Sequence, residues 1–276
     1  MKPPPFEYHA PRDLGQALST LAEVRGKVLA GGQSLIPMLN MRLAAPEHLV
    51  DINRVPELAV MEAAPDGVRI GAAVRHAEVE RAGAHPLLVR ALKLVAHPVI
   101  RNRGTVVGSL AHADPAAELP AVLAVLGGSV RLARAGAPER DVGAAEFFVG
   151  PMESAVQEGE LAVSAYFPAL GPRTGGAFEE VTRRHGDYAL AGVCAVVTLG
   201  EDGAIEAARL ACIGVGPVPV VVDVTGSPDD AARIVRERTE PDGDVHASAA
   251  YRRHLVGVLA ERALRNATRE AQARGA

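Results

Sequence analysis

The stretch NRGTVVGSLAHADPAAELP, residues 102–120, decides the fold that this sequence predicts. Its first half, Gly104 to Ser109, is predicted to be a glycine-containing loop whose backbone N–H groups close on an anion. Its second half carries Asp114 and Glu118, and carboxylates accept hydrogen bonds well from the hydroxyls of a sugar or polyol. The structural alternative is that both acids only cap and solvate a helix that begins near Glu118, with Pro120 in its first turn.

A second glycine turn occurs earlier, in LAGGQSLIP at residues 29–37. A short strand is predicted over 27–30, and Gly31–Gly32 after it can turn tightly and expose consecutive N–H groups in a concave nest. Ser34 offers a hydroxyl donor and Gln33 an amide. A Gly-Gly turn alone is more often only a turn, but two such loops can hold a diphosphate from both sides.

Composition and missing motifs exclude several classes of function. The 29 basic and 33 acidic side chains give a net charge of −4, which argues against a nucleic-acid partner. No GxGxxG follows a predicted strand and no GxxxxGK[ST] occurs. Two cysteines, Cys194 and Cys212, are too few to hold an iron–sulfur cluster. The sequence also shows no nucleophile–base pair, so it predicts no catalytic residue and no metal ligand. Five histidines lack the spacing of metal ligands and are expected to be mostly surface or capping residues: His76, His85, His97, His112 and His185.

Nothing in the sequence predicts targeting to a membrane. The N-terminal MKPPPFEYHAP lacks the apolar region of a signal peptide. The longest apolar run, residues 188–200, is shorter than the roughly 20 residues that a bilayer requires. We therefore expect no transmembrane segment and a cytoplasmic location.

The rest of the sequence predicts a chain of both helices and strands, and its amino-acid composition changes near residue 170. The segment FPALGPRTGGAF, residues 167–178, holds two prolines and three glycines and is the best linker candidate. After it, 188–200 and 205–216 are predicted to be antiparallel strands joined by the turn residues EDG. Helices are expected over 12–24, 76–83, 87–96, 118–126, 229–238 and from about 248, and Asp13 is the expected N-cap of the first. Further strands are expected over 27–30, 48–52, 67–74 and 127–134.

Four motifs in a fixed order carry a family resemblance: AGGQSLIPMLNMRL, IRNRGTVVGSLAHADPAAELPA, FFVGP and RRHGDYALAGV. Together they resemble the FAD-binding medium subunit of molybdenum hydroxylases, the carbon monoxide dehydrogenase and xanthine dehydrogenase group, over nearly the whole chain. The resemblance implies an α+β fold with a two-lobed FAD-binding domain at 1–170, its α/β lobes at about 1–55 and 56–170. A smaller C-terminal domain, an antiparallel sheet flanked by helices, is expected at 175–276.

The same resemblance implies FAD as the cofactor and assigns residues to it. Leu161 matches a position that meets the flavin end. Tyr188 matches a residue beside the isoalloxazine ring, whereas the sequence alone would make it a core tyrosine opening a strand. Glu118 falls where the family often places an acid near the ribityl chain, and Asp114 is assigned to hydroxyl groups. The two loops complete the predicted set: Leu29, Ala30, Gly31, Gly32, Gln33, Ser34, Leu35 and Ile36 in the first, and Thr105, Val106, Val107, Gly108 and Ser109 in the second.

Two positions depart from the family pattern. The second loop usually reads Thr-x-Gly-Gly, whereas here Val107 precedes Gly108. If position 107 needs a positive φ or a close backbone approach, valine would weaken FAD binding roughly 5- to 150-fold, equivalent to about 1–3 kcal/mol. Glu179 stands where xanthine dehydrogenase-type members often carry lysine, which favours the carbon monoxide dehydrogenase-like branch and weakens the case for NAD as acceptor.

The predicted function is that of an oxidoreductase flavoprotein subunit, inactive without its partners. Electrons would come from a molybdopterin-containing large subunit through the 2Fe-2S clusters of a small subunit, pass to FAD and leave to an external acceptor, either a quinone or NAD. Two alternatives stay open: a flavin-free structural subunit in which Val107 has closed the site, and a stand-alone flavin oxidoreductase. The substrate is not specified, because its pocket would lie on another chain.

Overall fold

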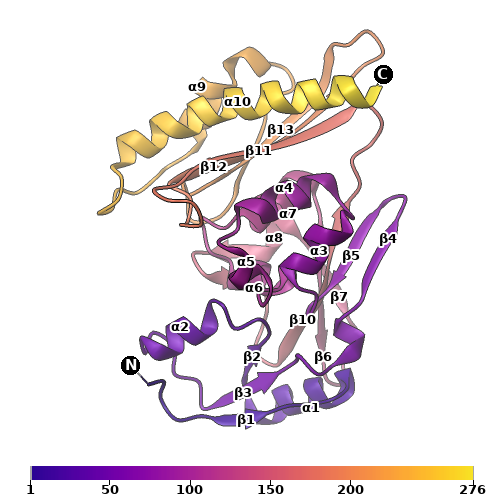
Figure 1. The fold of residues 1–276 in the computed structure, drawn as a ribbon, viewed down its shortest axis with the longest axis vertical. Coiled ribbons are helices and arrows are strands. Elements are labelled where there is room, and N and C mark those ends of the chain that lie inside the picture. The colour runs from indigo at the N-terminus through magenta and orange to yellow at the C-terminus, as the bar shows by residue number, and fades with distance from the viewer. Residues whose placement is uncertain (1, 276) are drawn as a thin grey trace.

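The computed structural model describes residues 2–275, so the predicted domain limits at Met1 and Ala276 lie outside the described residues. Three units follow one another along the long axis of the molecule (Figure 1), and we name them by their sheets. They are the N-terminal lobe (2–55), the middle lobe (56–168) and the C-terminal unit (174–275). Within residues 2–275, no helix combines the length and apolar character needed to cross a membrane.

The N-terminal lobe is a three-stranded parallel sheet of order β1-β3-β2 with a helix packed against β3. The helix begins as predicted at Asp13, whose carboxylate accepts a hydrogen bond from the backbone N–H of Gln16 at 2.8 Å. Leu21 and Ala17 form its buried face. The elements of this lobe are β1 (Glu7–His9), α1 (Leu14–Val24), β2 (Lys27–Leu29), α2 (Leu35–Asn40) and β3 (His48–Asp51).

The middle lobe is built on a five-stranded antiparallel sheet of order β4-β5-β10-β6-β7. Its central strand, β10 (Glu160–Pro168), is buried along nearly its whole length and was not predicted from the sequence. Because both faces are covered, the segment lacks the polar–apolar alternation of a half-exposed strand. The other elements are η1 (Pro56–Leu58), β4 (Met61–Ala64), β5 (Gly67–Gly71), α3 (His76–Ala82), α4 (Pro86–Leu94), α5 (Pro98–Arg101), α6 (Val106–His112), α7 (Glu118–Leu126), β6 (Ser129–Arg134), β7 (Arg140–Gly143), α8 (Ala144–Phe147), β8 (Phe148–Gly150) and β9 (Glu153–Ser154).

The linker predicted over 167–178 is shorter than expected. Strand β10 runs to Pro168 and β11 (Thr174–Val181) begins soon after it, so only 169–173 lie between the strands. Gly175 is inside β11 because helix α10 (Ala249–Gly275) packs directly on it. A Cβ on Gly175 would lie 2.1 Å from the carbonyl oxygen of Ala267. The glycines that suggested a flexible linker therefore serve a close strand–helix contact.

The C-terminal unit is a four-stranded antiparallel sheet of order β11-β12-β13-β14, and the predicted hairpin is its centre. Helix α10 lies across one face of the sheet (Figure 1), while α7 of the middle lobe contacts β12 and β13. The predicted α+β class, with an antiparallel C-terminal sheet flanked by helices, is confirmed. The remaining elements are β12 (Ala191–Leu199), β13 (Ile205–Ile213), β14 (Val220–Asp223), η2 (Pro228–Asp230) and α9 (Ala231–Arg238).

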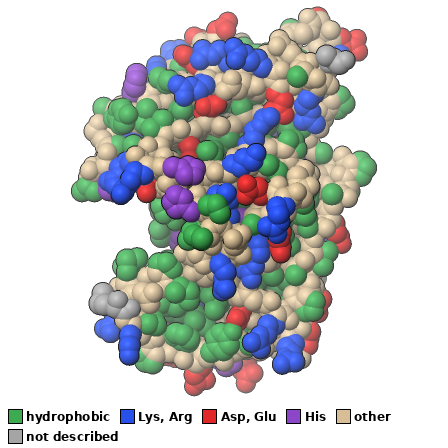
Figure 2. Space-filling view, viewed as in Figure 1, with side chains coloured by type: hydrophobic (Ala, Val, Ile, Leu, Met, Phe, Trp, Pro, Cys, Tyr) green, Lys and Arg blue, Asp and Glu red, His purple; other side chains and the backbone are tan. Residues whose placement is uncertain are grey.

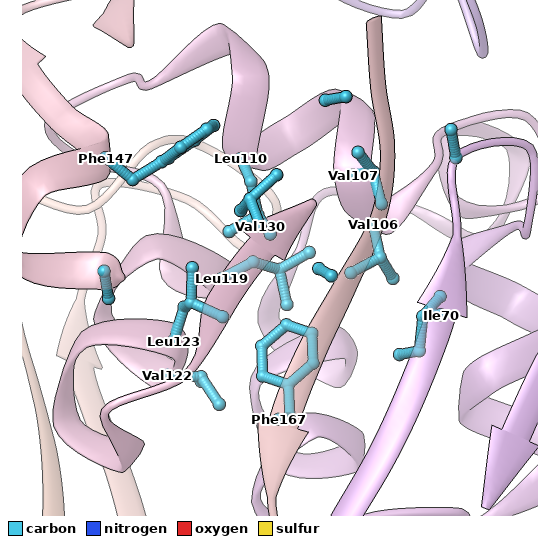
Figure 3. Close-up of a cluster of buried hydrophobic side chains, with 14 of the residues drawn as sticks. Ile70, Val106, Val107, Leu110, Leu119, Val122, Leu123, Val130, Phe147 and Phe167 are labelled. Carbon is cyan, nitrogen blue, oxygen red and sulfur yellow. The ribbon is translucent and has the colours of Figure 1, made fainter. Parts of the chain in front are cut away.

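Buried apolar side chains form a large cluster centred on the middle lobe and a second cluster under α10. Figure 3 shows part of the larger cluster, in which Val106, Val107 and Leu110 of α6 lie among Phe167, Ile70 and the side chains of α7. Helix α7 is buried from Glu118 to Val125. The segment 102–120 therefore contributes directly to the core.

Candidate functional site

The first predicted loop lies between β2 and α2 and packs against the second segment. Gly32 has φ +73°, which glycine adopts without strain. A Cβ on Gly31 would lie 2.3 Å from the carbonyl oxygen of Arg103 and 2.8 Å from the Cα of Gly104. Only glycine permits this approach of one backbone to the other, so the two segments that the sequence paired do lie together.

The carbonyl groups of the first loop are engaged in hydrogen bonds within the protein. The oxygens of Ala30, Gly31 and Gly32 accept hydrogen bonds from Asn53 Nδ2 at 2.8 Å, Gln33 Nε2 at 3.1 Å and Ile36 N at 3.0 Å, respectively. Among the described residues, the backbone N–H groups of 31–34 donate to no protein acceptor. Four consecutive N–H groups without a protein acceptor, at a loop that contains a positive-φ glycine, are the kind of donors that a phosphate-binding nest requires.

The second segment is a helix start rather than the loop predicted over Gly104 to Ser109. Thr105 is the N-cap of α6, and its Oγ1 accepts a hydrogen bond from Gly108 N at 3.1 Å. A threonine cap satisfies a donor of the first turn, which favours the helix over an open loop. A Cβ on Gly108 would lie 2.5 Å from Thr105 Oγ1, and the Cβ of Ala30 in the first loop would lie 3.9 Å away, in ordinary contact.

Val107 does not enter the space between the two segments. It lies in α6, is absent from the positive-φ residues of the described chain, and is 2% exposed within the large apolar cluster. Figure 3 shows its side chain near Val106, on the core side of the helix. The backbone strain and the steric loss of affinity considered for this position therefore do not arise.

Arg75, which the sequence did not single out, ties the two segments to each other. It precedes α3, and its guanidinium donates to the carbonyl oxygen of Arg103 at 2.6 Å and to Asn53 Oδ1 at 2.5 Å. Because the amide of Asn53 in turn donates to Ala30 O, one chain of hydrogen bonds connects both sides of the site. These contacts fix the spacing of the two backbones.

His76 lies directly beneath the second segment and is buried, contrary to the expected surface or capping role. A Cβ on Gly104 would lie 3.0 Å from the His76 ring, and neither ring nitrogen has a hydrogen-bond partner. Burial lowers the pKa of His76 to about 4, so the ring is neutral near pH 7. His85 is also buried, and it does cap its helix: its Nδ1 accepts from Leu88 N at 3.4 Å.

A cluster of acids adjoins the segment that follows α6. Asp114 and Glu118 are both buried, which is not the solvated helix start offered as their structural alternative. Burial first, then the charges of Glu180 and Asp114, raise the pKa of Glu118 to about 8. Burial raises the pKa of Glu180, in β11, to about 7. Glu118 is therefore a neutral carboxyl group near pH 7, able both to donate and to accept a hydrogen bond from a hydroxyl.

Tyr188 and Leu161 occupy very different surroundings. Tyr188 is 60% exposed and lies before β12, which begins at Ala191, so it is not a core tyrosine. Partial burial, followed by the charges of Asp114 and Glu118, raises its pKa to about 12. Leu161 is 2% exposed in β10 and packs in the large apolar cluster.

The two segments border a hollow in the surface. Figure 2 shows the outline indented between the N-terminal lobe and the rest of the molecule, at the level of α5 and α6 in Figure 1. The chemistry of the residues fits FAD: N–H groups without a protein acceptor for a diphosphate, buried carboxyl groups for hydroxyls, and an exposed aromatic side chain. The sequence pattern missed Asn53, Arg75, His76 and Glu180, because only tertiary contacts bring them to this region.

Comparison with known proteins agrees with this arrangement. Residues 4–170 match the family described as the FAD binding domain in molybdopterin dehydrogenase. Residues 176–267 match the CO dehydrogenase flavoprotein C-terminal domain. These matches support FAD as the cofactor.

Individual relatives resemble the chain over its whole length. It is 40% identical to the 6-hydroxypseudooxynicotine dehydrogenase complex subunit alpha of Paenarthrobacter nicotinovorans, covering 99% of this chain and 97% of that one. It is 36% identical to the carbon monoxide dehydrogenase medium chain of Hydrogenophaga pseudoflava, covering 96% and 97%. A solved carbon monoxide dehydrogenase from Hydrogenophaga pseudoflava, which lacks the Mo-pyranopterin moiety of the molybdenum cofactor, contains a chain that superposes with a TM-score of 0.90 at 34% identity and 100% coverage of both chains.

The matched family spans more than half of the chain, and the relatives share its fold from end to end. This chain belongs to the FAD-binding flavoprotein subunits of the molybdopterin dehydrogenases.

Proposed function

We propose that this chain is the electron-transfer subunit of a molybdenum hydroxylase complex. It would receive electrons from the 2Fe-2S clusters of a small subunit, which are reduced in turn by a molybdopterin-containing large subunit, and would deliver them to an external acceptor. Bound FAD supplies the redox chemistry of this step, because its ring exchanges both single electrons and pairs. The cytoplasmic location and the domain limits 1–170 and 175–276 predicted from the sequence belong to the same proposal.

The observation that carries the proposal is the contact between the first loop and the start of α6. Gly31 packs on the backbone at 103–104, and the free N–H groups of 31–34 lie beside it. A diphosphate bound between these segments would be contacted by the loop on one side and by the start of α6 on the other, before Gly108 and Ser109, whose N–H groups donate to Thr105. Since both segments are held by Arg75 and Asn53, the donors are preorganised before the cofactor binds.

The other predicted residues would orient the rest of the cofactor. Asp114 and neutral Glu118 would hydrogen-bond to ribityl or ribose hydroxyls, and Tyr188 would lie against the isoalloxazine ring and limit access to it. Leu161 would contact the flavin end only by its backbone, because its side chain is buried in the core.

The proposal assigns the iron–sulfur clusters and the molybdenum cofactor to partner subunits. Cys194 and Cys212 are both buried, free thiols whose pKa values burial raises, so neither is poised to ligate iron at the surface. The relatives are named as a subunit of a dehydrogenase complex and as a medium chain, which supports assembly with other chains. Those two relatives carry different substrates in their names, in keeping with a substrate pocket outside this chain.

The choice of acceptor rests on a weaker feature. Glu179 in β11 accepts a hydrogen bond from Asn266 Nδ2 at 2.7 Å and lies 3.9 Å from Arg262 Nη1, so it joins the sheet to α10. This position departs from the lysine of xanthine dehydrogenase-type members, so we retain the carbon monoxide dehydrogenase-like branch and a weaker case for NAD, with the acceptor left open between a quinone and NAD. The flavin-free alternative loses its premise, since Val107 lies in the core rather than in the site.

Purification of the native complex tests the proposal. Affinity capture of this chain should co-purify a molybdenum-containing and an iron-containing subunit, and the flavin should be reduced by substrate only in that complex. A yellow chain that turns over substrate alone would instead support the stand-alone flavin oxidoreductase. A complex that contains molybdenum and iron but releases no flavin on denaturation would contradict the electron-transfer role.

A further inference from the structure

Three potential metal ligands, Glu7, His9 and His48, meet on the sheet of the N-terminal lobe. Strands β1 and β3 run parallel with Glu7 opposite His48 and His9 opposite Val50. Glu7 and His9 are two residues apart on one strand and therefore point to the same face. Tyr8 between them points to the other face, where its hydroxyl donates to the carboxylate of Asp51.

The distances between the ligand atoms suit a single ion. His9 Nε2 and His48 Nδ1 lie 3.2 Å apart, and Glu7 Oε2 lies 3.6 Å from His48 Nδ1. All three ligand atoms lie within 4.8 Å of one another. Ligands at about 2.0 Å from a tetrahedral ion are separated by about 3.3 Å, so small side-chain rotations would bring the set to a common centre.

The backbone under these side chains is firmly held. Leu49 and Val50, which follow His48, are 1% and 0% exposed, and the N–H of Glu7 donates to the carbonyl oxygen of Glu47 at 2.8 Å. The His48 side chain is 24% exposed and that of Glu7 is 75% exposed. The ligand positions are thus fixed by strand register, while the ligand atoms stay open to ions from solvent.

The donor set selects the class of ion. Two imidazole nitrogens and one carboxylate oxygen suit zinc and its neighbours in the first transition row, whereas calcium and magnesium prefer oxygen ligands alone. Three protein ligands leave a fourth tetrahedral position for water or for a group from another molecule.

We propose that Glu7, His9 and His48 form a zinc(II)-binding site at the surface of the N-terminal lobe. The ion joins β1 to β3 by side chains in addition to the backbone ladder. Because β3 also pairs with β2, which leads into the first loop, bound zinc stabilises the strand that supports one side of the cofactor site. The site itself does not depend on FAD.

Zinc titration of the untagged, full-length chain tests this proposal. Calorimetry of the wild type should show one zinc ion bound per chain, and zinc should raise the melting temperature. His48→Ala and His9→Ala should each weaken binding by about tenfold or more, since even indirect changes at metal sites cost about that much. Cobalt(II) should give the visible absorption of a tetrahedral ion in the wild type and lose it in both variants.

Two further variants separate a specific site from general effects. Glu7→Gln keeps the size of an exposed side chain and should weaken zinc binding without lowering the melting temperature of the metal-free chain. His254→Ala removes an exposed histidine on α10 and should bind zinc as the wild type does. No saturable binding to the wild type, or equal binding by the wild type and His48→Ala, would overturn the proposal.

Discussion

Gly31 is the residue whose size most constrains the site. A Cβ added to Gly31 would meet backbone atoms of residues 103–104. Backbone atoms cannot move aside, whereas the end of a flexible side chain could. Any larger residue must therefore separate the two segments. The requirement is one of space, because Gly31, unlike Gly32, does not have a positive φ.

Gly31→Ala should weaken FAD binding by about tenfold or more, about 1.4 kcal/mol, because the donors on the two sides no longer converge. Equilibrium titration of the apoprotein with FAD measures this loss. Gly226→Ala is the matched control, since nothing lies within 4 Å of a Cβ there and its φ is not positive. Equal FAD affinity in the two variants would show that the contact between the segments does not support the site.

Val107→Gly should lower stability without improving FAD binding. The change removes a buried side chain and puts glycine inside a helix, which together cost about 2–4 kcal/mol. Urea unfolding of the apoprotein measures the first effect and FAD titration the second. A clear gain in FAD affinity would mean that the valine side chain limits the site after all.

Glu118→Gln should change how stability depends on pH. The pKa of Glu118 is raised from its usual 4.5 to about 8, so between these values the native state keeps a proton that the unfolded chain has lost. Its contribution to stability is therefore fully present below about pH 4.5 and is lost as pH rises through about 8. Glutamine stays neutral, so the variant should gain stability relative to the wild type with rising pH, by at most a few kcal/mol.

Unfolding free energies at several pH values across this range, for the apoproteins, measure the difference. Glu146→Gln, at an exposed position in α8, should follow the wild-type profile. A constant difference between Glu118→Gln and the wild type at all pH values would contradict a neutral buried carboxyl group.

At the scale of elements, α6 shows how a glycine-containing segment can be helical. Gly108 and the valines before it suggested an open loop, but Thr105 caps the helix and Val106, Val107 and Leu110 bury one face of it. The glycine is needed for the cap itself, because a Cβ at position 108 would lie 2.5 Å from Thr105 Oγ1. The sequence predicted that the segment 104–109 lies opposite the first loop. It did not predict the helix, because that depends on which valines are buried in the core.

Strands β10 and β11 were harder to predict for two different reasons. Strand β10 is covered on both faces, so its pattern has no alternation to detect. Strand β11 contains Gly175 and follows Pro172, a composition typical of linkers. Its glycine is explained only by α10, which the sequence places almost a hundred residues away.

Gly175→Ala should destabilise the C-terminal unit by about 3 kcal/mol or more, because a Cβ would lie 2.1 Å from Ala267 O and 2.4 Å from Ala271 N. Thermal and urea unfolding measure the loss. Gly171→Ala, in the exposed segment before β11, is the control and should unfold like the wild type, since the nearest atom to its Cβ is Thr174 Oγ1 at 3.5 Å. A stable Gly175→Ala variant would show that α10 is free to shift on the sheet.

At the scale of the whole molecule, the proposed diphosphate site lies where the N-terminal and middle lobes meet. One side of it belongs to the parallel sheet through β2 and the other to the middle lobe through α6, and Arg75 joins them. Sequence motifs predicted both halves and their pairing. They did not predict Arg75, Asn53 or Glu180, whose roles come from contacts between distant parts of the chain.

A crystal structure of the FAD complex tests the proposed diphosphate site most directly. We predict that the diphosphate oxygens lie within hydrogen-bonding distance of backbone N–H groups of both segments, 31–34 and 105–109. A diphosphate bound elsewhere, or held by only one of the two segments, would contradict the site proposed for this chain.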